Sequence, residues 1–365
     1  MTTLYDVARL AGVSTATVSR VLHEQDRVRE STRARVKKAI EELGYVPDSA
    51  AQSLSRRRKE VIGIICIERP ANNHENMNLT YTDELLHGVE AHIRTLDWSL
   101  LITFWNEATD PGFPRLDAMS GKVDGVLIGE GSFPPRLVDR LARRVPVAVI
   151  AGPPDERQVD IVTADNHAGS VAVVTHLVEA HGSRRLFHLD GPANAPDASQ
   201  RRLALEQVLR DHPGSRLIGT THGSFSVESG EDAAIRILDA FPEGRLPDAI
   251  VCANDQMAIG LLRAFAKGGV RVPEEVAVVG FDDIFPGSLS NPPLTTVYQP
   301  MRTLGERACA RLMERIAAPD LPPTVELLPT ELVIRQSCGC PPGSTIRQPV
   351  HHLPRTLLRT LREER

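Results

Sequence analysis

From Val61 onward, short apolar runs alternate with segments of helical periodicity, and this alternation is the feature that most constrains the fold. Eight runs read as strands, several of them almost wholly apolar: VIGIICI, SLLITFW, DGVLIG, PVAVIA, DIVTAD, RRLFHLDGP, DAIVCAND and EVAVVGFDD. Strands without a polar face are typical of a parallel sheet that is covered by helices on both sides. Repeated βα units of this length therefore predict an α/β body with two doubly wound lobes.

The first sixty residues have a different pattern, that of three short helices. Thr3 and Asp6 have the spacing of a capping box at the start of the first helix, and Gly12 suits its end. Ser14 can cap a second helix only two residues later, and Ser31 is the expected cap of a third. Because so short a connection makes two helices cross steeply, we predict an all-α helix-turn-helix head.

The second helix, within GVSTATVSRVL, presents small side chains opposite its buried valine stripe. A helix that enters the major groove of DNA needs short side chains where base edges approach it. The hydroxyls of Thr15 and Thr17 can bond bases or phosphates, and Arg20 can bond O6 and N7 of a guanine. We therefore predict a recognition helix; the alternative is an ordinary three-helix interaction module.

Charge and composition fit a two-part chain. Residues 1–60 hold 12 Lys/Arg against 8 Asp/Glu, whereas the rest of the 365 residues hold 30 against 39. A basic head on an acidic body suggests that only the head touches a polyanion. No apolar run approaches about 20 residues, the start of the chain has no basic-then-apolar leader, and the five cysteines are scattered. We expect a cytoplasmic, nucleoid-associated protein.

Two long stretches of the head, TLYDVARLAGVSTATVSRVL and VRESTRARVKKAIEELGYVPDSAAQSL, resemble the LacI/GalR family of transcription regulators. In the body, GVEAH, VDGVLIG, DAIVCANDQMAIGLLRAF, VPEEVAVVGFDDI and PPLTTVYQP resemble the effector-binding core of that family, which is similar to the type I periplasmic sugar-binding proteins. The resemblance covers residues 3–340. It implies a homodimeric repressor that binds a pseudo-palindromic operator, is controlled by a small molecule, and is not an enzyme.

The resemblance also implies roles for single residues. The positions matching Thr15 and Ala16 select the operator sequence, and the position matching Leu54 wedges into the minor groove at the operator centre. The residues implied to contact DNA are Tyr5, Ser14, Thr15, Ala16, Thr17, Ser19, Arg20, His23, Ala51 and Leu54. The residues implied to contact the effector are Tyr81, Arg201, Phe225, Asn254, Asp282 and Gln299. An aromatic ring, an arginine and a carboxylate favour a sugar or a sugar derivative.

These patterns divide the chain into four parts. We expect the helix-turn-helix domain in residues 1–46, a hinge helix and linker in 47–60, the two-lobed effector domain in 61–340, and a disordered tail in 341–365. The hinge helix is too short to be stable alone, so it should fold on binding DNA. A leucine run in the tail resembles the tetramerising heptads of some family members, but Pro354 interrupts it. Cys338, Cys340, His351 and His352 are capable of binding a metal, but their spacing is poor, and we expect unbound surface thiols, no metal and no cofactor.

Two alternatives remain open from the sequence. Polar residues follow several predicted strands, and adjacent Asp282 and Asp283 raise the possibility of an enzyme that acts on carbohydrates. Neighbouring strand-end residues point to opposite sides, and no nucleotide-binding glycine loop is present, so we predict that the chain is not an enzyme. The second alternative is a regulator without small-molecule control, because Ala151 and Ser183 stand where family members usually have an acidic residue and a histidine.

Overall fold

The computed structural model describes residues 2–22, 28–45, 58–67, 79–107, 109–129, 133–153, 159–242, 246–343 and 345–350. The chain divides into two compact units, Met1–Glu60 and Val61–Arg365. Within the described ranges, every helix is too short or too polar to cross a membrane.

The first unit consists of three helices around a small apolar core. These are α1 (Leu4–Ala11), α2 (Thr15–Leu22) and α3 (Glu30–Leu43). Each helix contributes fully or nearly fully buried valines or alanines to the core, among them Val7, Val18 and Val36. Small apolar side chains let the three helices approach closely, so sixty residues suffice to bury a continuous centre.

The ends of these helices follow three of the four sequence signals, the third being the Ser14 hydroxyl, which accepts from the backbone N–H of Thr17 at the start of α2. Thr3 and Asp6 form the predicted capping box, and Gly12 ends α1 with a φ of 63°. The prediction that Ser31 caps the third helix is wrong. The helix begins two residues earlier than a Ser31 cap implies, at Glu30, and Arg29 occupies the capping position without a side-chain hydrogen bond. A serine in the first turn is therefore not by itself a reliable marker of the first residue.

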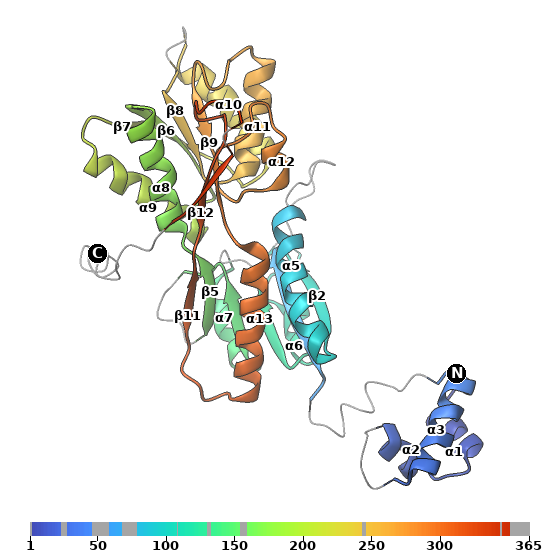
Figure 1. Cartoon of the computed structure of the whole chain (residues 1–365). Coiled ribbons are helices and arrows are strands. Elements are labelled where there is room, and N and C mark those ends of the chain that lie inside the picture. Colours follow the sequence, from blue (N-terminus) through green and yellow to red (C-terminus); the bar gives the residue numbers. More distant parts are fainter. Residues whose placement is uncertain are drawn as a thin grey trace. The chain divides into compact units, whose positions relative to one another are not determined.

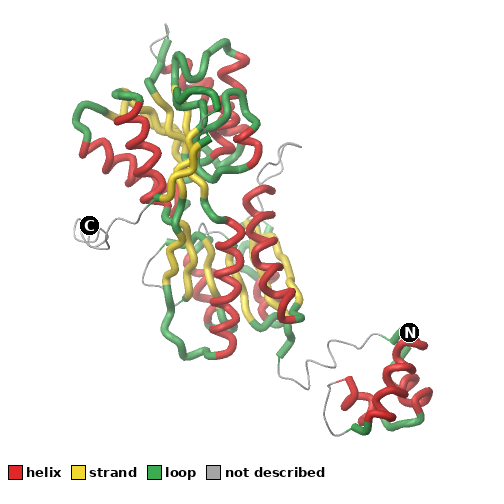
Figure 2. The backbone as a smooth tube through the Cα atoms, viewed as in Figure 1, coloured by secondary structure: helices red, strands yellow, loops and turns green. Residues whose placement is uncertain are grey.

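The first lobe of the body is built on a six-stranded parallel sheet in the order β11-β5-β4-β3-β1-β2. Its strands are β1 (Val61–Ile67), β2 (Ser99–Trp105), β3 (Gly125–Ile128), β4 (Val147–Ile150), β5 (Asp160–Ala164) and β11 (Val325–Leu328). Helices α5 (Leu79–Ile93) and α13 (Met301–Ala317) pack on one face, and α6 (Pro114–Ser120) and α7 (Pro135–Ala142) pack on the other. The layers are visible in Figures 1 and 2.

The second lobe has a four-stranded parallel sheet in the order β7-β6-β8-β9. Its strands are β6 (Arg185–Asp190), β7 (Arg216–His222), β8 (Ala249–Cys252) and β9 (Ala277–Val279). One face carries α8 (Asn166–Thr175) and α9 (Pro196–Asp211), and the other carries α10 (Val227–Ala240) and α11 (Asp255–Lys267). The predicted fold class, a helical head followed by two parallel-sheet lobes, is therefore confirmed.

A third, antiparallel sheet was not predicted. It consists of β10 (Thr296–Tyr298), β12 (Glu331–Ile334) and β13 (Ile346–Pro349). The expectation that the tail from 341 onward is disordered is thus wrong for Ile346–Pro349, because this segment pairs with β12 and because Arg347 forms an ion pair with Asp283. The leucine run of the tail, together with His351 and His352, lies outside the described residues.

The backbone passes between the two lobes three times. The first crossing comes after β5, the second just before α13, and the third between β11 and β12. Residues 301–328 consequently return to the first lobe, where α13 packs against α5 and β11 completes the sheet. The helices α5 and α13 meet at glycines: a Cβ atom at Gly88 would lie 1.9 Å from the carbonyl oxygen of Arg302, and one at Gly305 would lie 2.1 Å from that of Leu85.

Candidate functional site

Several of the predicted DNA contacts are exposed on the helix-turn-helix unit. Tyr5 is 76% exposed, and Ala16 and Arg20 are exposed on α2. At the start of α2, the backbone N–H of Thr17 donates to the Ser14 hydroxyl at 3.2 Å, and the two hydroxyl oxygens are 2.9 Å apart. The start of the helix is thereby fixed, and its small first-turn side chains can approach a base edge.

Two further predicted DNA contacts on α2, Thr15 and Ser19, are half-buried. The other three, His23, Ala51 and Leu54, lie outside the described residues, as does most of the predicted hinge segment 47–60. Their roles therefore stay predictions.

In the body, the backbone brings Asp282 and Gln299 together. Asp282 follows β9, and its backbone N–H donates to the carbonyl oxygen of Val297 at 2.8 Å, beside β10. The side-chain amide of Gln299 then donates to the Asp282 carboxylate at 2.6 Å. Both side chains are buried, with 6% and 2% of their surface exposed. Polar groups at the carboxyl ends of parallel strands are the usual ligand contacts of open α/β sheets.

Arg201 reaches the same carboxylate from the other side. Its Nη1 atom lies 3.7 Å from Oδ1 of Asp282 and donates to the carbonyl oxygen of Ala253 at 2.5 Å. Its Nε atom donates to the side chain of Asn166 at 2.9 Å, and its guanidinium lies 3.7 Å from the centre of the Phe281 ring. Arginine, carboxylate and amide form one buried, charge-balanced group between helix α9 and the strand ends.

The remaining predicted effector contacts lie near this group and make other contacts. Asn254 caps α11: its side-chain oxygen accepts from the backbone N–H of Met257 at 3.0 Å, and its amide donates to the carbonyl oxygen of Phe225 at 3.3 Å. Phe225 is half-buried and has a φ of 62°. Tyr81, near the start of α5, packs against the apolar cores of both lobes.

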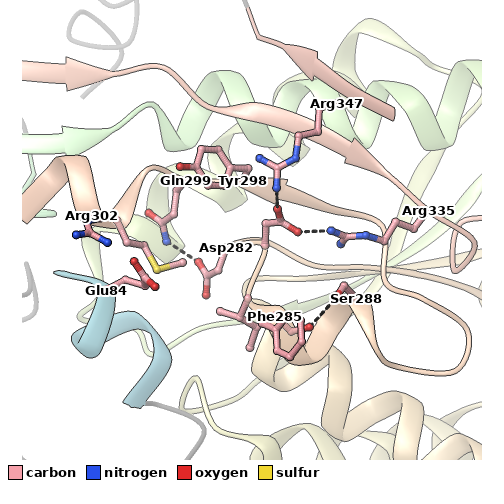
Figure 3. A pocket seen from close by; sticks show the side chains of 12 residues that line it. Glu84, Asp282, Phe285, Ser288, Tyr298, Gln299, Arg302, Arg335 and Arg347 are labelled. Atoms are coloured by element: carbon pink, nitrogen blue, oxygen red, sulfur yellow. Dashed lines mark hydrogen bonds and ion pairs between the residues drawn. The ribbon is translucent and has the colours of Figure 1, made fainter. Parts of the chain in front are cut away.

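A cavity of about 360 Å³ adjoins the buried group where the lobes meet. Asp282 and Gln299 line it, and Arg201, Phe225, Asn254 and Tyr81 do not. Glu84 and Arg302 contribute opposite charges from α5 and α13 (Figure 3). The lining also includes the apolar side chains of Ile284, Phe285 and Met301 and the polar side chains of Ser288 and Tyr298. Such a lining suits a small ligand with several hydroxyl or amide groups and one apolar face.

Asp283 has different partners from Asp282. Its two carboxylate oxygens accept from Arg335 at 2.5 Å and from Arg347 at 2.6 Å. Asp282 instead faces Arg201 and Gln299. The two adjacent carboxylates therefore do not share a proton, which agrees with the prediction that they are not a catalytic pair.

A third carboxylate, Asp255, is fully buried behind the group. Its oxygens lie 2.6 Å from the Thr296 hydroxyl and 3.0 Å from the backbone nitrogen of Ile284. Burial, and then the nearby charge of Asp282, raise the pKa of Asp255 to about 8. Burial therefore favours the protonated form of Asp255, whereas Arg201 lies beside the carboxylates of Asp282 and Asp197.

Sequence reasoning missed several residues of this region. Asn166 follows the strand DIVTAD and was recognisable as a polar residue at a strand end. Its hydrogen bond to Arg201 could not be recognised from the sequence. Glu84 and Arg302 lie in helices that have no distinctive motif. Arg335 follows a short strand and Arg347 lies in another, and neither strand was predicted.

Comparisons with known proteins cover both units. Residues 3–48 match the family described as "Bacterial regulatory proteins, lacI family", and residues 174–338 match the "Periplasmic binding protein-like domain". The "HTH-type transcriptional repressor PurR" of Pasteurella multocida is 31% identical over 345 residues, which are 92% of this chain and 98% of that protein. The PurR repressor of Mannheimia succiniciproducens is 32% identical over 342 residues, with the same coverage.

Solved structures agree with the sequence comparison. The lac repressor dimer bound to operator and the anti-inducer ONPF superimposes with a TM-score of 0.79 at 29% identity, over 92% of this chain and 99% of that one. A complex of the transcriptional regulator CelR with cellobiose superimposes with a TM-score of 0.67 at 30% identity, over 92% of this chain and 100% of that one. Relatives and structural neighbours alike are transcription regulators and not enzymes.

Proposed function

Since the chain belongs to the LacI family and is a DNA-binding repressor, we propose that two copies of it bind a pseudo-palindromic operator in the cytoplasm and that a sugar or sugar derivative between the lobes controls this binding. Each head would occupy one half-site, with α2 in the major groove. The residues proposed to contact DNA are Tyr5, Ser14, Thr15, Ala16, Thr17, Ser19, Arg20, His23, Ala51 and Leu54.

The observation that carries small-molecule control is the buried group of Arg201, Asp282 and Gln299 beside the cavity. Burying an arginine and a carboxylate that are only 5% and 6% exposed is costly, and the position of this pair beside a cavity at the lobe junction supports a polar ligand there. Hydroxyl groups of a sugar can bond to both, and the half-buried ring of Phe225 can cover its apolar face. Arg201, Phe225, Asn254 and Tyr81 do not line the cavity itself, so the proposed ligand would extend beyond the cavity toward them. The structural neighbour in complex with cellobiose supports a carbohydrate.

Self-association is supported by the edge of the first-lobe sheet. Strand β2 is the last strand of that sheet, and its Ile102 and Phe104 are 43% and 47% exposed. An exposed apolar edge strand favours contact with a second chain. The dimeric architecture named in the lac repressor structure points the same way. Sedimentation of the purified chain tests this assembly, and a monomer at micromolar concentration would contradict it.

Operator binding is tested by gel shift on DNA from upstream of the chain's own gene, with a random duplex for comparison. We expect Arg20→Ala to weaken specific binding by about 1–3 kcal/mol because a bidentate contact to guanine is lost. Arg9→Ala is the matched control, since Arg9 is an exposed arginine on α1 that pairs with Asp6. Equal affinity of the unaltered chain for both duplexes would refute sequence-specific binding.

Effector binding is tested by a thermal-shift screen with sugars, polyols and nucleobases. We expect a sugar to raise the melting temperature of the unaltered chain, and Asp282→Asn to weaken its binding by about 1.5–3 kcal/mol because a charge-assisted hydrogen bond is lost. Asp160→Asn is the control, because Asp160 is an equally buried carboxylate at the opposite end of a strand, where it pairs with Arg315. If a nucleobase binds instead, the proposal that the effector is a sugar is wrong. If no compound binds, the chain is a regulator without small-molecule control.

A further inference from the structure

Four side chains that bind soft metals converge in the second lobe, away from the group around Asp282. They are His176, His181, Cys338 and Cys340, and their four ligand atoms all lie within 4.8 Å of one another. Both cysteines were expected to be unbound surface thiols. That expectation is wrong for Cys338, which is only 2% exposed and belongs to the apolar core of the lobe.

Four of the six distances between these atoms are close to the edges of a metal-centred tetrahedron, and the other two are no longer than 4.8 Å. The Nε2 atoms of the two histidines are 3.2 Å apart, Nε2 of His176 is 3.6 Å from each sulfur, and Nε2 of His181 is 3.4 Å from the sulfur of Cys340. Around a tetrahedral zinc ion, with Zn–N of about 2.0–2.1 Å and Zn–S of about 2.3 Å, ligand atoms stand about 3.3 Å (N–N), 3.6 Å (N–S) and 3.8 Å (S–S) apart.

Hydrogen bonds alone do not account for this arrangement. Nε2 of His176 lies within 3.6 Å of three partners at once, namely Nε2 of His181 and the two sulfurs. A ring nitrogen has a single in-plane site, which holds either one proton or one lone pair, and so it can satisfy only one of them. A cation at the centre would instead be bound by all four atoms.

The backbone is shaped to bring the two histidines together. They are five residues apart, and in an α-helix such residues point about 140° away from each other. Here α8 continues into a π-helical turn, His176–Ala180, and His181 follows directly. The wider turn places both rings on one side, and π-helical turns are frequently found at functional sites.

The two cysteines are held by the turn that follows β12. Gly339 between them has a φ of 105°, and a Cβ atom there would lie 3.3 Å from Nδ1 of His181. Paired cysteines of zinc sites usually have two to four residues between them, and here they have one. Because that residue is a glycine, the backbone can still direct both sulfurs toward the histidines. The Thr295 hydroxyl donates to the sulfur of Cys338 at 3.2 Å, and such a hydrogen bond would orient a metal-bound thiolate and stabilise its charge.

We propose that His176, His181, Cys338 and Cys340 form a structural zinc site. Two imidazole nitrogens and two thiolate sulfurs are a tetrahedral set that selects Zn²⁺ over Mg²⁺ or Ca²⁺. All four positions are filled by protein, so the ion has no open position for chemistry. Its role is to clamp the end of α8 to the turn after β12, which are more than 150 residues apart in the chain.

The test uses the full chain without a histidine tag, stripped with a chelator and then given Zn²⁺ or Co²⁺. We expect about one Zn²⁺ per chain by elemental analysis. Co²⁺ should give the intense visible bands of tetrahedral coordination and a thiolate charge-transfer band. Zn²⁺ should also raise the melting temperature of the body. Failure to retain Zn²⁺, a Co²⁺ spectrum without thiolate charge transfer, or a Cys338–Cys340 disulfide in freshly reduced protein would each overturn the proposal.

Variants locate the site. Cys340→Ser and His181→Ala should lose the metal and its effect on the melting temperature. The matched controls are Cys66→Ala and His212→Ala, since Cys66 is buried in the first lobe and His212 pairs with Glu179 outside the cluster. Should the site variants fail to fold, alkylation of the unaltered chain decides the matter. The peptide carrying Cys338 and Cys340 should resist alkylation with Zn²⁺ and react after chelation, and equal reactivity in both states would refute the site.

Discussion

Asp255, Asp282 and Asp283 lie close together in the second lobe, yet each has its own environment. Asp282 faces Arg201, Asp283 is held by Arg335 and Arg347, and Asp255 is fully buried without a basic partner among the described residues. Asp282 and Asp283 also have positive φ values, 128° and 59°. Backbone strain of this kind persists where the surroundings fix it, and it is found preferentially at binding sites.

The raised pKa of Asp255 makes stability depend on pH. Between the ordinary value of 3.8 and the raised value of about 8, the folded chain keeps a proton that the unfolded chain has lost. The contribution of this group is therefore fully present below the ordinary pKa and is lost as the pH rises through the raised one. We expect the free energy of unfolding of the body to fall between pH 5 and 8, by at most about 1.4 kcal/mol per pH unit.

Asp255→Asn should remove that part of the pH dependence, because an amide keeps an acceptor for the backbone N–H of Ile284 and does not titrate. Urea unfolding of both proteins at several pH values measures it. Asp232→Asn, at an exposed carboxylate on α10, serves as the control. Parallel pH profiles for the unaltered chain and Asp255→Asn would show that Asp255 titrates normally.

At the scale of elements, the close contact between α5 and α13 depends on two glycines. We expect Gly88→Ala to lower the free energy of unfolding by about 1–3 kcal/mol or more, since the added methyl group would meet the backbone of α13 and force the helices apart. Gly121→Ala is the control, because a Cβ there meets only one carbonyl oxygen, at 3.5 Å, and φ is −71°. Chemical denaturation measures both, and a similar loss in the two variants would contradict the packing argument.

The strands show which elements can be predicted from local sequence patterns and which cannot. All eight apolar runs form strands, because burial on both faces leaves a continuous apolar signature. Strands β7 and β11 escaped prediction because at most one residue of each is buried. Strands β10, β12 and β13 also escaped it, since they are only three or four residues long and β13 is exposed throughout. Their stability comes from pairing with each other and from the ion pairs of Asp283, which are contacts between distant residues. Local patterns do not contain that information.

The binding sites, like the strands, were predictable only in part. The rule that ligands bind at strand ends, together with the family resemblance, pointed to Asp282, Gln299 and Arg201, and these three do converge. The cluster around His176 was not predictable, because its two halves are far apart in sequence and a π-helical turn, which has no recognised sequence signal, brings the histidines together.

At the scale of the whole molecule, charge is segregated between head and body. The excess of basic residues in 1–60 and of acidic residues elsewhere favours contact of DNA with the head alone. We expect the operator affinity to fall steeply with salt, by about 10³–10⁵ between about 50 and 200 mM if the paired heads make roughly six to ten phosphate contacts. Effector affinity should change little, since its site is buried and charge-balanced.

Titration of labelled operator at several salt concentrations measures the slope, and titration of the effector in the same buffers gives the comparison. An operator affinity that does not depend on salt would rule out phosphate contacts as its main source. Equal slopes for both ligands would show that the salt acts on the fold of the body.

The threefold passage of the backbone between the lobes affects the order of events during synthesis on the ribosome. When residue 164 has emerged, the first lobe has five strands but lacks β11 and α13, which belong to residues 301–328. The parallel sheet of the second lobe, by contrast, is encoded without interruption between these two segments. The parallel sheet that is begun first is therefore completed after that of the second lobe, and until α13 is made, the apolar face that it will cover stays open to chaperones or to wrong partners.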